Sequence, residues 1–348
     1  MGAPRVDDSS RTGTEHRPIG DVRAEEPIET LGVALDRVLQ VSSDLTKAIG
    51  TVIEGKDDVI RTALVALLAE GHLLLEDVPG VGKTMLAKSL ARSIDCTVRR
   101  VQFTPDLLPS DISGVSVWNQ DLRQFEFRPG AIFANVVVGD EINRASPKTQ
   151  SALLECMEEN QVTVDGTTYA LPRPFMVMAT QNPIEMEGTY PLPEAQRDRF
   201  LARISMGYPN PRAELELLES HGETDPLEAL RPVTDAATVE AMIRTVRRVH
   251  ASPAVRQYIV DLATATRSSS ALRLGASPRA TLHLLRASRA AAALRGRDHV
   301  LPDDVKAIIV PVIAHRVILS GESQLARRSA ADVLNDLVDR TRVPAPQR

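Results

Sequence analysis

The chain has 348 residues and a formal net charge of −5, and 43% of its residues are hydrophobic. These values are typical of a globular protein with one large domain or two ordinary ones. The negative balance gives no bulk positive field for non-specific nucleic-acid binding. The only two cysteines, Cys96 and Cys156, argue against a disulfide framework. Without a signal peptide or an apolar run near ~18 residues, we expect a cytoplasmic protein with no membrane span.

The first part of the chain changes character near residue 29. Residues 1–28 are polar, carry mixed charges and lack periodicity, which predicts a disordered tail. From residue 29 to residue 206, helical stretches alternate with short apolar runs, the pattern of a parallel α/β sheet. We expect five strands in this domain, over residues 73–75, 98–103, 136–138, 175–179 and 201–206.

Local signals refine this pattern and end the domain. Ser146 followed by Pro147 predicts the start of a helix over residues 146–160, and Asp165-Gly166 between β-forming residues predicts a hairpin. Residues 207–212 contain Gly and Pro and form the best domain boundary. Beyond it we expect a domain made only of helices over 213–322 and a C-terminal helix or tail over 323–348. The predicted helices of this second part are 213–220, 237–249, 254–266, 279–294 and 302–319.

A phosphate-binding loop follows the first predicted strand. The run Asp77-Val-Pro-Gly80-Val-Gly82-Lys83-Thr84 leads into a helix, and glycines there let backbone N–H groups turn toward a phosphate. Lys83 is expected to reach the terminal phosphates, and the Thr84 hydroxyl to bind Mg²⁺. The strict pattern opens with glycine, whereas this chain has Asp77 at that position. The predicted nucleotide-binding residues of the loop are Gly80, Val81, Gly82, Lys83, Thr84 and Met85.

Two later strands end in polar residues that suit hydrolysis. The third predicted strand ends in Asp140-Glu141, so Asp140 can order the Mg²⁺ shell while Glu141 activates the attacking water. The fourth is followed by Asn182, whose amide could hold that water or the γ-phosphate. The alternative interpretation of Asn182 is a turn residue before proline.

Together these motifs resemble AAA+ ATPases, and longer strings resemble the MoxR family in particular. The resemblance covers residues 30–322, and it leaves out the N-terminus and the last two dozen residues. It implies a five-stranded P-loop NTPase core followed by a helical lid. The strings that carry it lie in residues 133–136, 140–145, 147–154, 179–183, 188–196 and 198–200.

The resemblance also implies roles for single residues. Asn182 would be sensor 1, and Arg199 would be the arginine finger that completes the neighbouring subunit's site, with Arg197 as a rival. Arg279 would be sensor 2, reaching from the lid to nucleotide bound between the α/β domain and the lid. Ile53 and Gly55 belong to the loop that meets the adenine. Residues 105–127 would form the helix-2 insertion of this clade, and the Asp165-Gly166 hairpin the pre-sensor-1 insertion.

The implied activity is Mg²⁺-dependent ATP hydrolysis by a homo-oligomeric ring, typically a hexamer. Family members are regarded as chaperone-like remodellers of protein complexes or of metal-cofactor insertion, often with von Willebrand factor A proteins. Two alternatives stay open: a nucleic-acid translocase related to AAA+ helicases, and a nucleotide switch that does not hydrolyse. The acidic balance disfavours nucleic acid as a partner, and the presence of Glu141 and Arg199 disfavours a pure switch.

Overall fold

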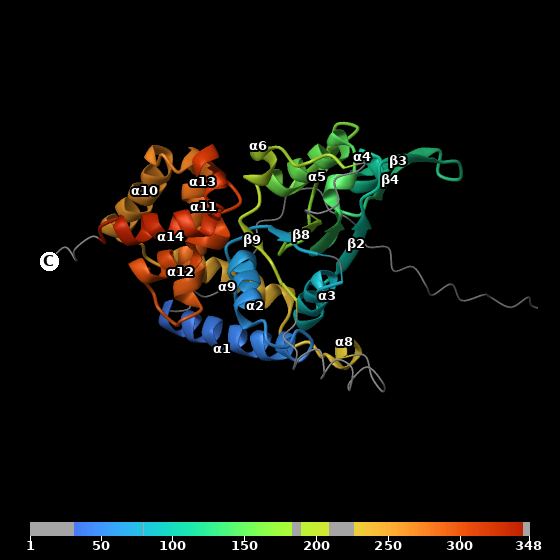
Figure 1. Cartoon of the computed structure of the whole chain (residues 1–348). Coiled ribbons are helices and arrows are strands. Elements are labelled where there is room, and N and C mark those ends of the chain that lie inside the picture. Colours follow the sequence, from blue (N-terminus) through green and yellow to red (C-terminus); the bar gives the residue numbers. More distant parts are fainter. Residues whose placement is uncertain (1–30, 79, 183–188, 209–225, 344–348) are drawn as a thin grey trace, which may run out of the picture.

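The computed structural model describes residues 31–78, 80–182, 189–208 and 226–343, and it divides into an α/β core and a mainly helical lid (Figure 1). The predicted tail over 1–28 and the predicted helix over 213–220 lie outside these residues. Within them, no helix is long and apolar enough to cross a membrane.

A five-stranded sheet forms the centre of the core. Its order is β2-β5-β8-β1-β9, and every neighbouring pair is parallel. Strands β1, β5 and β8 are almost wholly buried because helices cover both faces, whereas β2 is an edge strand that exposes its arginines. All five predicted strands are confirmed, as β1 (Leu73–Glu76), β2 (Val98–Gln102), β5 (Val136–Asp140), β8 (Met176–Gln181) and β9 (Ala202–Ile204).

Helices and two hairpins surround this sheet. As predicted, Ser146 caps α5, and its hydroxyl accepts a hydrogen bond from the Thr149 N–H at 3.4 Å. The hairpin β6–β7 is also confirmed; Asp165 and Gly166 both have positive φ, as a tight primed turn requires. The core elements are α1 (Leu31–Gly50), α2 (Asp57–Leu68), α3 (Lys83–Ser93), α4 (Pro109–Ser113), β3 (Gly114–Asn119), β4 (Gln124–Pro129), the 3-10 helix η1 (Ile142–Arg144), α5 (Pro147–Glu159), β6 (Gln161–Val164), β7 (Thr167–Ala170) and α6 (Glu194–Arg197).

The lid departs from the prediction in two places: it contains a pair of strands, and the helix predicted over residues 302–319 ends at Ile313. A short antiparallel pair, β10–β11, interrupts the helices, so the expectation of a part made only of helices was wrong in this detail. Segments of two or three residues are too short to show a periodic pattern. The lid elements are α8 (Pro226–Ala229), α9 (Ala236–Arg248), α10 (Pro253–Ser268), β10 (Leu272–Leu274), α11 (Pro278–Ala293), α12 (Pro302–Ile313), β11 (Ile318–Leu319), α13 (Gly321–Leu325) and α14 (Ala330–Arg340).

One apolar cluster joins the lid to the core. It runs from α1, α2, α3, β1 and β9 through α9, α11 and α12. The predicted C-terminal helix is present as α14, and it adds Val333, Leu334 and Val338 to the same cluster. The lid is therefore packed directly on the helices that flank the sheet.

Candidate functional site

The phosphate loop lies at the carboxyl end of β1, where α3 begins. Gly80 and Gly82 have φ of +83° and +91°, a backbone region that favours glycine. Nothing lies within 4 Å of the place where a Cβ on Gly80 would stand, so this side of the loop is open. The free N–H groups at the start of α3 together with this open loop form a site suited to a phosphate.

Lys83 lies inside the loop. Its Nζ donates hydrogen bonds to the backbone carbonyls of Asp77 and Val78, at 2.6 and 3.0 Å. Burial lowers the pKa of Lys83, and the nearby carboxylates of Asp77, Asp140 and Glu141 partly oppose that shift. The ammonium is thus held by neutral carbonyl oxygens, which phosphate oxygens could replace as its acceptors.

Asp77, the departure from the usual loop sequence, anchors the loop to the end of the last strand. Its carboxylate accepts hydrogen bonds from the Gly207 N–H at 2.6 Å, the Ser205 hydroxyl at 2.9 Å and the Val78 N–H at 2.9 Å. Burial pushes the pKa of Asp77 upward, but these hydrogen bonds outweigh burial and hold the pKa below its ordinary value. An aspartate here therefore ties the phosphate loop to the segment that leaves the core.

Asp140 ends β5 beside the phosphate loop and is nearly buried. The Thr84 hydroxyl lies 3.4 Å from both oxygens of its carboxylate, and the Thr180 hydroxyl donates to one of them at 3.3 Å. The Arg100 Nε lies 2.5 Å from the other. Hydroxyl and carboxylate oxygens are hard donors of the kind that Mg²⁺ prefers, so Thr84 and Asp140 fit the predicted metal.

Glu141 takes a left-handed conformation, with φ of 59°, which is uncommon for a residue with a side chain. Its N–H donates to the Thr180 hydroxyl at 3.0 Å. Its carboxylate accepts from the Gln102 amide at 2.7 Å and is paired with the Arg144 Nε at 3.0 Å. The carboxylate is thus held by two side chains at the edge of the site.

Thr180 is a site residue that the sequence reasoning missed. Its hydroxyl accepts from the Glu141 backbone and donates to Asp140, so it fixes the two acidic residues relative to each other. Its position near the end of β8, two residues before Asn182, was the available signal. Thr180 reaches both acidic residues because β8 lies directly beside β5 in the sheet, between β5 and β1.

The remaining predicted nucleotide residues lie around the loop. Asn182 is buried directly after β8, and the preceding Gln181 carbonyl accepts the Asp77 N–H at 3.3 Å. Ile53 is buried in the apolar cluster against which Val81 and Met85 pack. Gly55, in the same turn region as Ile53, has a φ of 67°.

The two predicted arginines, Arg199 and Arg279, lie at the opposite ends of the strands from the phosphate loop. His72, which precedes β1, accepts the Leu201 N–H through its carbonyl at 2.8 Å, and its ring contacts the Met157 carbonyl at 2.9 Å. Because His72 lies at the amino end of β1, the chain segment with Arg199 lies at the amino ends of the strands. The end of α5 lies there too. The phosphate loop is at the carboxyl ends of the strands.

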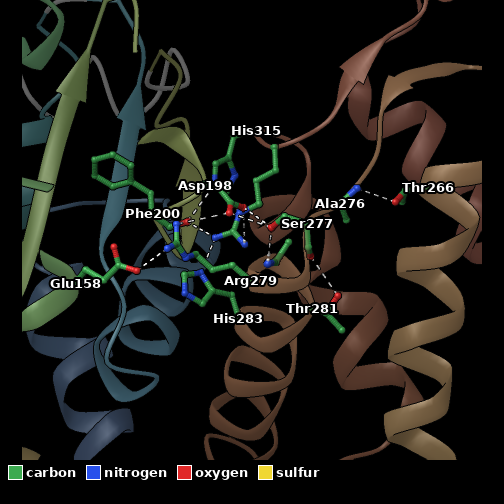
Figure 2. A network of polar contacts seen from close by, with 12 residues as sticks. Glu158, Asp198, Phe200, Thr266, Ala276, Ser277, Arg279, Thr281, His283 and His315 are labelled. Carbon is green, nitrogen blue, oxygen red and sulfur yellow. Dashed lines mark hydrogen bonds and ion pairs between the residues drawn. The ribbon is translucent and has the colours of Figure 1, made fainter. Parts of the chain in front are cut away.

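At the amino ends of the strands, Arg199 and Arg279 share one carboxylate. Glu158 on α5 pairs with Arg199 Nη2 at 3.2 Å and with Arg279 Nη2 at 2.5 Å, and the Arg279 contact is drawn in Figure 2. Both arginines are about one-third exposed, at 31% and 35%. The rival, Arg197, is paired only loosely with Glu194, at 4.0 Å.

In the single chain Arg279 pairs with Glu158 near the end of α5, at the amino ends of the strands and away from the phosphate loop. Its expected contact with nucleotide stays a prediction. Arg279 lies there together with Arg199. The structure brings together Lys83, Thr84, Asp140 and Glu141, and it separates both arginines from them.

Comparisons with known proteins agree with this architecture. Residues 72–202 match the model of the ATPase family associated with various cellular activities (AAA), and residues 264–337 match that of the AAA lid domain. A solved structure from Cytophaga hutchinsonii, named for an inferred ATPase activity, is similar with a TM-score of 0.83 and 37% identity. The match covers 90% of this chain and 99% of that one.

Two curated relatives extend the match over most of the chain. The chaperone MoxR1 of Mycobacterium tuberculosis is 41% identical over 302 residues, which are 84% of this chain and 80% of the relative. The Bacillus subtilis protein YeaC is 49% identical over 296 residues, which are 85% and 92% of the two chains. With the phosphate loop, the acidic strand end and the lid in place, the chain belongs to the MoxR family of AAA+ ATPases and is an ATP-hydrolysing enzyme.

Proposed function

We propose that the protein is a Mg²⁺-dependent ATPase whose active sites are completed between neighbouring copies in a ring. The observation that carries the proposal is the separation of the phosphate loop from Arg199 and Arg279 across one sheet. A head-to-tail arrangement of copies would bring the arginines of one subunit against the phosphate loop of the next. Repeated around a closed rotation, that contact gives a ring, and the family resemblance favours a hexamer.

Within one subunit, the phosphate loop and its neighbours would bind ATP. The N–H groups of the loop and the Lys83 ammonium contact phosphate oxygens, and the turn with Ile53 and Gly55 contacts the adenine. Thr84 and Asp140 would hold Mg²⁺, which neutralises charge on the β- and γ-phosphates when bound. Arg100 would have to leave Asp140 for this, and its half-exposed side chain has solvent to move into.

Glu141 is proposed as the general base. Its carboxylate, oriented by Gln102 and Arg144, accepts a proton from the attacking water as that water approaches the γ-phosphate. Asn182 supplies an amide at the same end of the sheet to position the water or the γ-phosphate.

From the neighbouring subunit, Arg199 and Arg279 would then supply positive charge at the γ-phosphate. Charge on the transferred group and its leaving oxygen grows in the transition state, so these guanidinium groups act more strongly there than in the ground state. In the single chain Glu158 occupies both of them, and this carboxylate stands where phosphate oxygens would bind.

The work done by hydrolysis is proposed to be the remodelling of a protein client. MoxR1, which is similar over most of this chain, is named a chaperone. A partner with a von Willebrand factor A domain is part of the same proposal, as the family resemblance implies.

The direct test is Glu141→Gln in a steady-state ATPase assay with Mg²⁺. We expect kcat to fall by about two orders of magnitude or more, because a general base contributes on that scale. ATP binding, measured with a fluorescent analogue, should persist because the loop is intact. Glu155→Gln, at an exposed position of α5, is the matched control and should behave as wild type.

An unchanged turnover in Glu141→Gln would remove Glu141 as the base. Absence of turnover in the wild-type protein at every concentration would support the switch alternative instead. Hydrolysis stimulated by DNA and abolished by added salt would support the translocase alternative.

A further inference from the structure

We propose that Asp198 and Arg316 are positioning residues that hold Arg199 and Arg279 together as one rigid unit for delivery to the neighbouring subunit's site. The inference rests on the proposed function, in which both arginines act across the interface. What the inference adds is the set of contacts that connects Arg199 of the core to Arg279 of the lid. Figure 2 shows this network between the strand end on one side and α11 on the other.

Arg316 holds the backbone beside Arg199. Its side chain is 1% exposed, and its Nη2 donates to the carbonyl of Phe200, the residue after Arg199. Its Nη1 lies 3.7 Å from a carboxylate oxygen of Asp198, the residue before Arg199. One buried guanidinium from the lid therefore contacts the chain on both sides of Arg199.

Asp198 holds the start of α11, which carries Arg279. The Ser277 hydroxyl donates to the Asp198 carboxylate at 2.8 and 2.9 Å to its two oxygens. The same hydroxyl accepts the Ala280 N–H at 3.0 Å and so caps α11. Arg279 is the second residue of α11, and its Nη1 lies 3.8 Å from Asp198. Asp198, the residue before Arg199 in the chain, thus links this part of the backbone to Arg279 and to the start of its helix.

The surroundings make this an unusual place for a charge. Arg316 Nη2 also donates to His283 Nδ1 at 2.6 Å, and His315 Nε2 contacts the Phe200 carbonyl at 3.1 Å. Burial lowers the pKa of Arg316 to about 10, with Asp198 opposing the shift, and burial also keeps both histidines neutral. A buried ion pair adds little to stability compared with apolar packing. Fixing the geometry of two functional arginines is a role that apolar side chains could not fill.

The test uses two kinds of full-length subunit that are inactive alone and complement each other when mixed. The donor subunit carries Lys83→Ala, so it cannot use its own site but still presents its arginines. The acceptor subunit carries Arg199→Ala, so it keeps an intact phosphate loop. The mixture should regain ATPase activity, because donor arginines complete acceptor sites.

Asp198→Asn is then added to either partner. In the donor it should lower the kcat of the mixture by about tenfold or more, with the KM for ATP unchanged, because the arginines are no longer held in place. In the acceptor it should have little effect. A loss of equal size in both partners, or no loss in the donor, would overturn the proposal.

If Asp198→Asn does not fold, a milder pair of variants at Ser277 tests the same contact. Ser277→Ala in the donor should lower the kcat of the mixture, and Ser277→Thr should restore it because the hydroxyl and the cap are retained. Donor activity unaffected by Ser277→Ala would contradict the proposal.

A matched control tests the general effect of disturbing a buried ion pair in the lid. Asp304, which is fully buried, binds Arg295 at 2.6 Å and Arg297 at 2.5 Å, and none of the three contacts Arg199 or Arg279. Asp304→Asn in the donor should leave the complemented kcat near its starting value. A mixture of the two parent subunits that shows no activity would overturn the arrangement across subunits, and this inference with it.

Discussion

Two aspartates in this protein act on the placement of other groups. Asp77 replaces the glycine that usually opens the phosphate loop, and it joins that loop to Ser205 and Gly207 in the segment just after β9. At the amino ends of the strands, Asp198 likewise joins two segments, because its carboxylate accepts hydrogen bonds from Ser277 of the lid. In both cases the carboxylate accepts several hydrogen bonds from segments that are distant in sequence. An aspartate in place of the usual glycine at position 77 therefore has a structural reason: it links the phosphate loop to the segment that leaves the core.

Replacing Asp77 tests this link. We expect Asp77→Gly, which restores the common loop sequence, to lower the free energy of unfolding by about 1–3 kcal/mol, because the donors from Ser205, Gly207 and Val78 lose their charged acceptor. The KM for ATP should rise as the loop loosens. Urea denaturation and ATPase kinetics measure the two effects.

The pH dependence of this difference gives a second readout. The pKa of Asp77 is lowered in the folded state, so its stabilising effect is complete above the ordinary aspartate value and is lost as the pH falls through the lowered folded pKa. The stability gap between wild type and Asp77→Gly should therefore narrow only in strongly acidic solution. A variant as stable as wild type at neutral pH would show that Asp77 is not an anchor.

Much of the candidate site was predictable from residue type and order, and its geometry was not. Gly80, Gly82, Lys83 and Thr84 lie between a strand and a helix, so local pattern was sufficient to place them. Thr180 was missed because its contribution depends on β8 lying next to β5, which sequence order does not reveal. The pairing of Arg279 with Glu158 could not be predicted for a similar reason, since only the fold brings α11 next to the end of α5.

At the scale of elements, the hairpin β3–β4 shows how glycines fix a projecting element to the core. Gly114 has a φ of +96°, and a Cβ on Gly130 would lie 2.2 Å from the Ile112 carbonyl oxygen. The hairpin extends well away from the sheet in Figure 1. Near its tip the exposed rings of Trp118 and Phe125 meet edge to face at 5.2 Å. The base is tightly packed, while the apolar tip is open to solvent.

Gly130→Ala should disturb this base specifically. The added methyl group meets backbone atoms that cannot move aside, so we expect a loss of about 1–3 kcal/mol in the free energy of unfolding. Trp118 is the only tryptophan, so its emission reports on the hairpin itself. Gly32→Ala is the control: apart from its chain neighbours and the backbone of its own helix, no atom lies within 4 Å of its Cβ position in α1, and stability should be equal or higher. Identical stabilities of the two variants would contradict this account.

At the scale of the whole molecule, three histidines lie where the core meets the lid: His72 and His315 are buried, and His283 is partly buried. His72 accepts the Val177 N–H at Nδ1, at 3.0 Å, and contacts the Met157 carbonyl through Nε2. Burial lowers the pKa of His72 to about 4 and that of His283 to about 2, and it lowers the pKa of His315 well below 6.5. The folded protein therefore keeps all three neutral under conditions in which an unfolded chain would protonate them.

Stability should consequently fall as the pH drops from about 6.5 toward 4. The unfolded chain binds protons in this range and the folded chain does not, so the equilibrium shifts toward unfolding. For His72 alone the loss at pH 5 is about 2 kcal/mol, from the difference between its ordinary pKa and about 4. Urea denaturation between pH 7.5 and pH 5 measures the slope. His72→Gln should give a flatter slope, and an unchanged slope would exclude His72 as a source.

In the proposed ring, the position of the phosphate loop at one end of the strands and of the arginines at the other would also determine how hydrolysis depends on assembly. If the phosphate loop of one copy is completed by Arg199 and Arg279 of the next, every copy contributes one half to each of two sites. An open row of copies then always leaves one phosphate loop and one arginine pair without a counterpart, and closing the ring converts these ends into one further site. Activity per copy would rise at closure without any new residue being added. A single copy defective in both its phosphate loop and its arginines would silence two sites, its own and that of its neighbour.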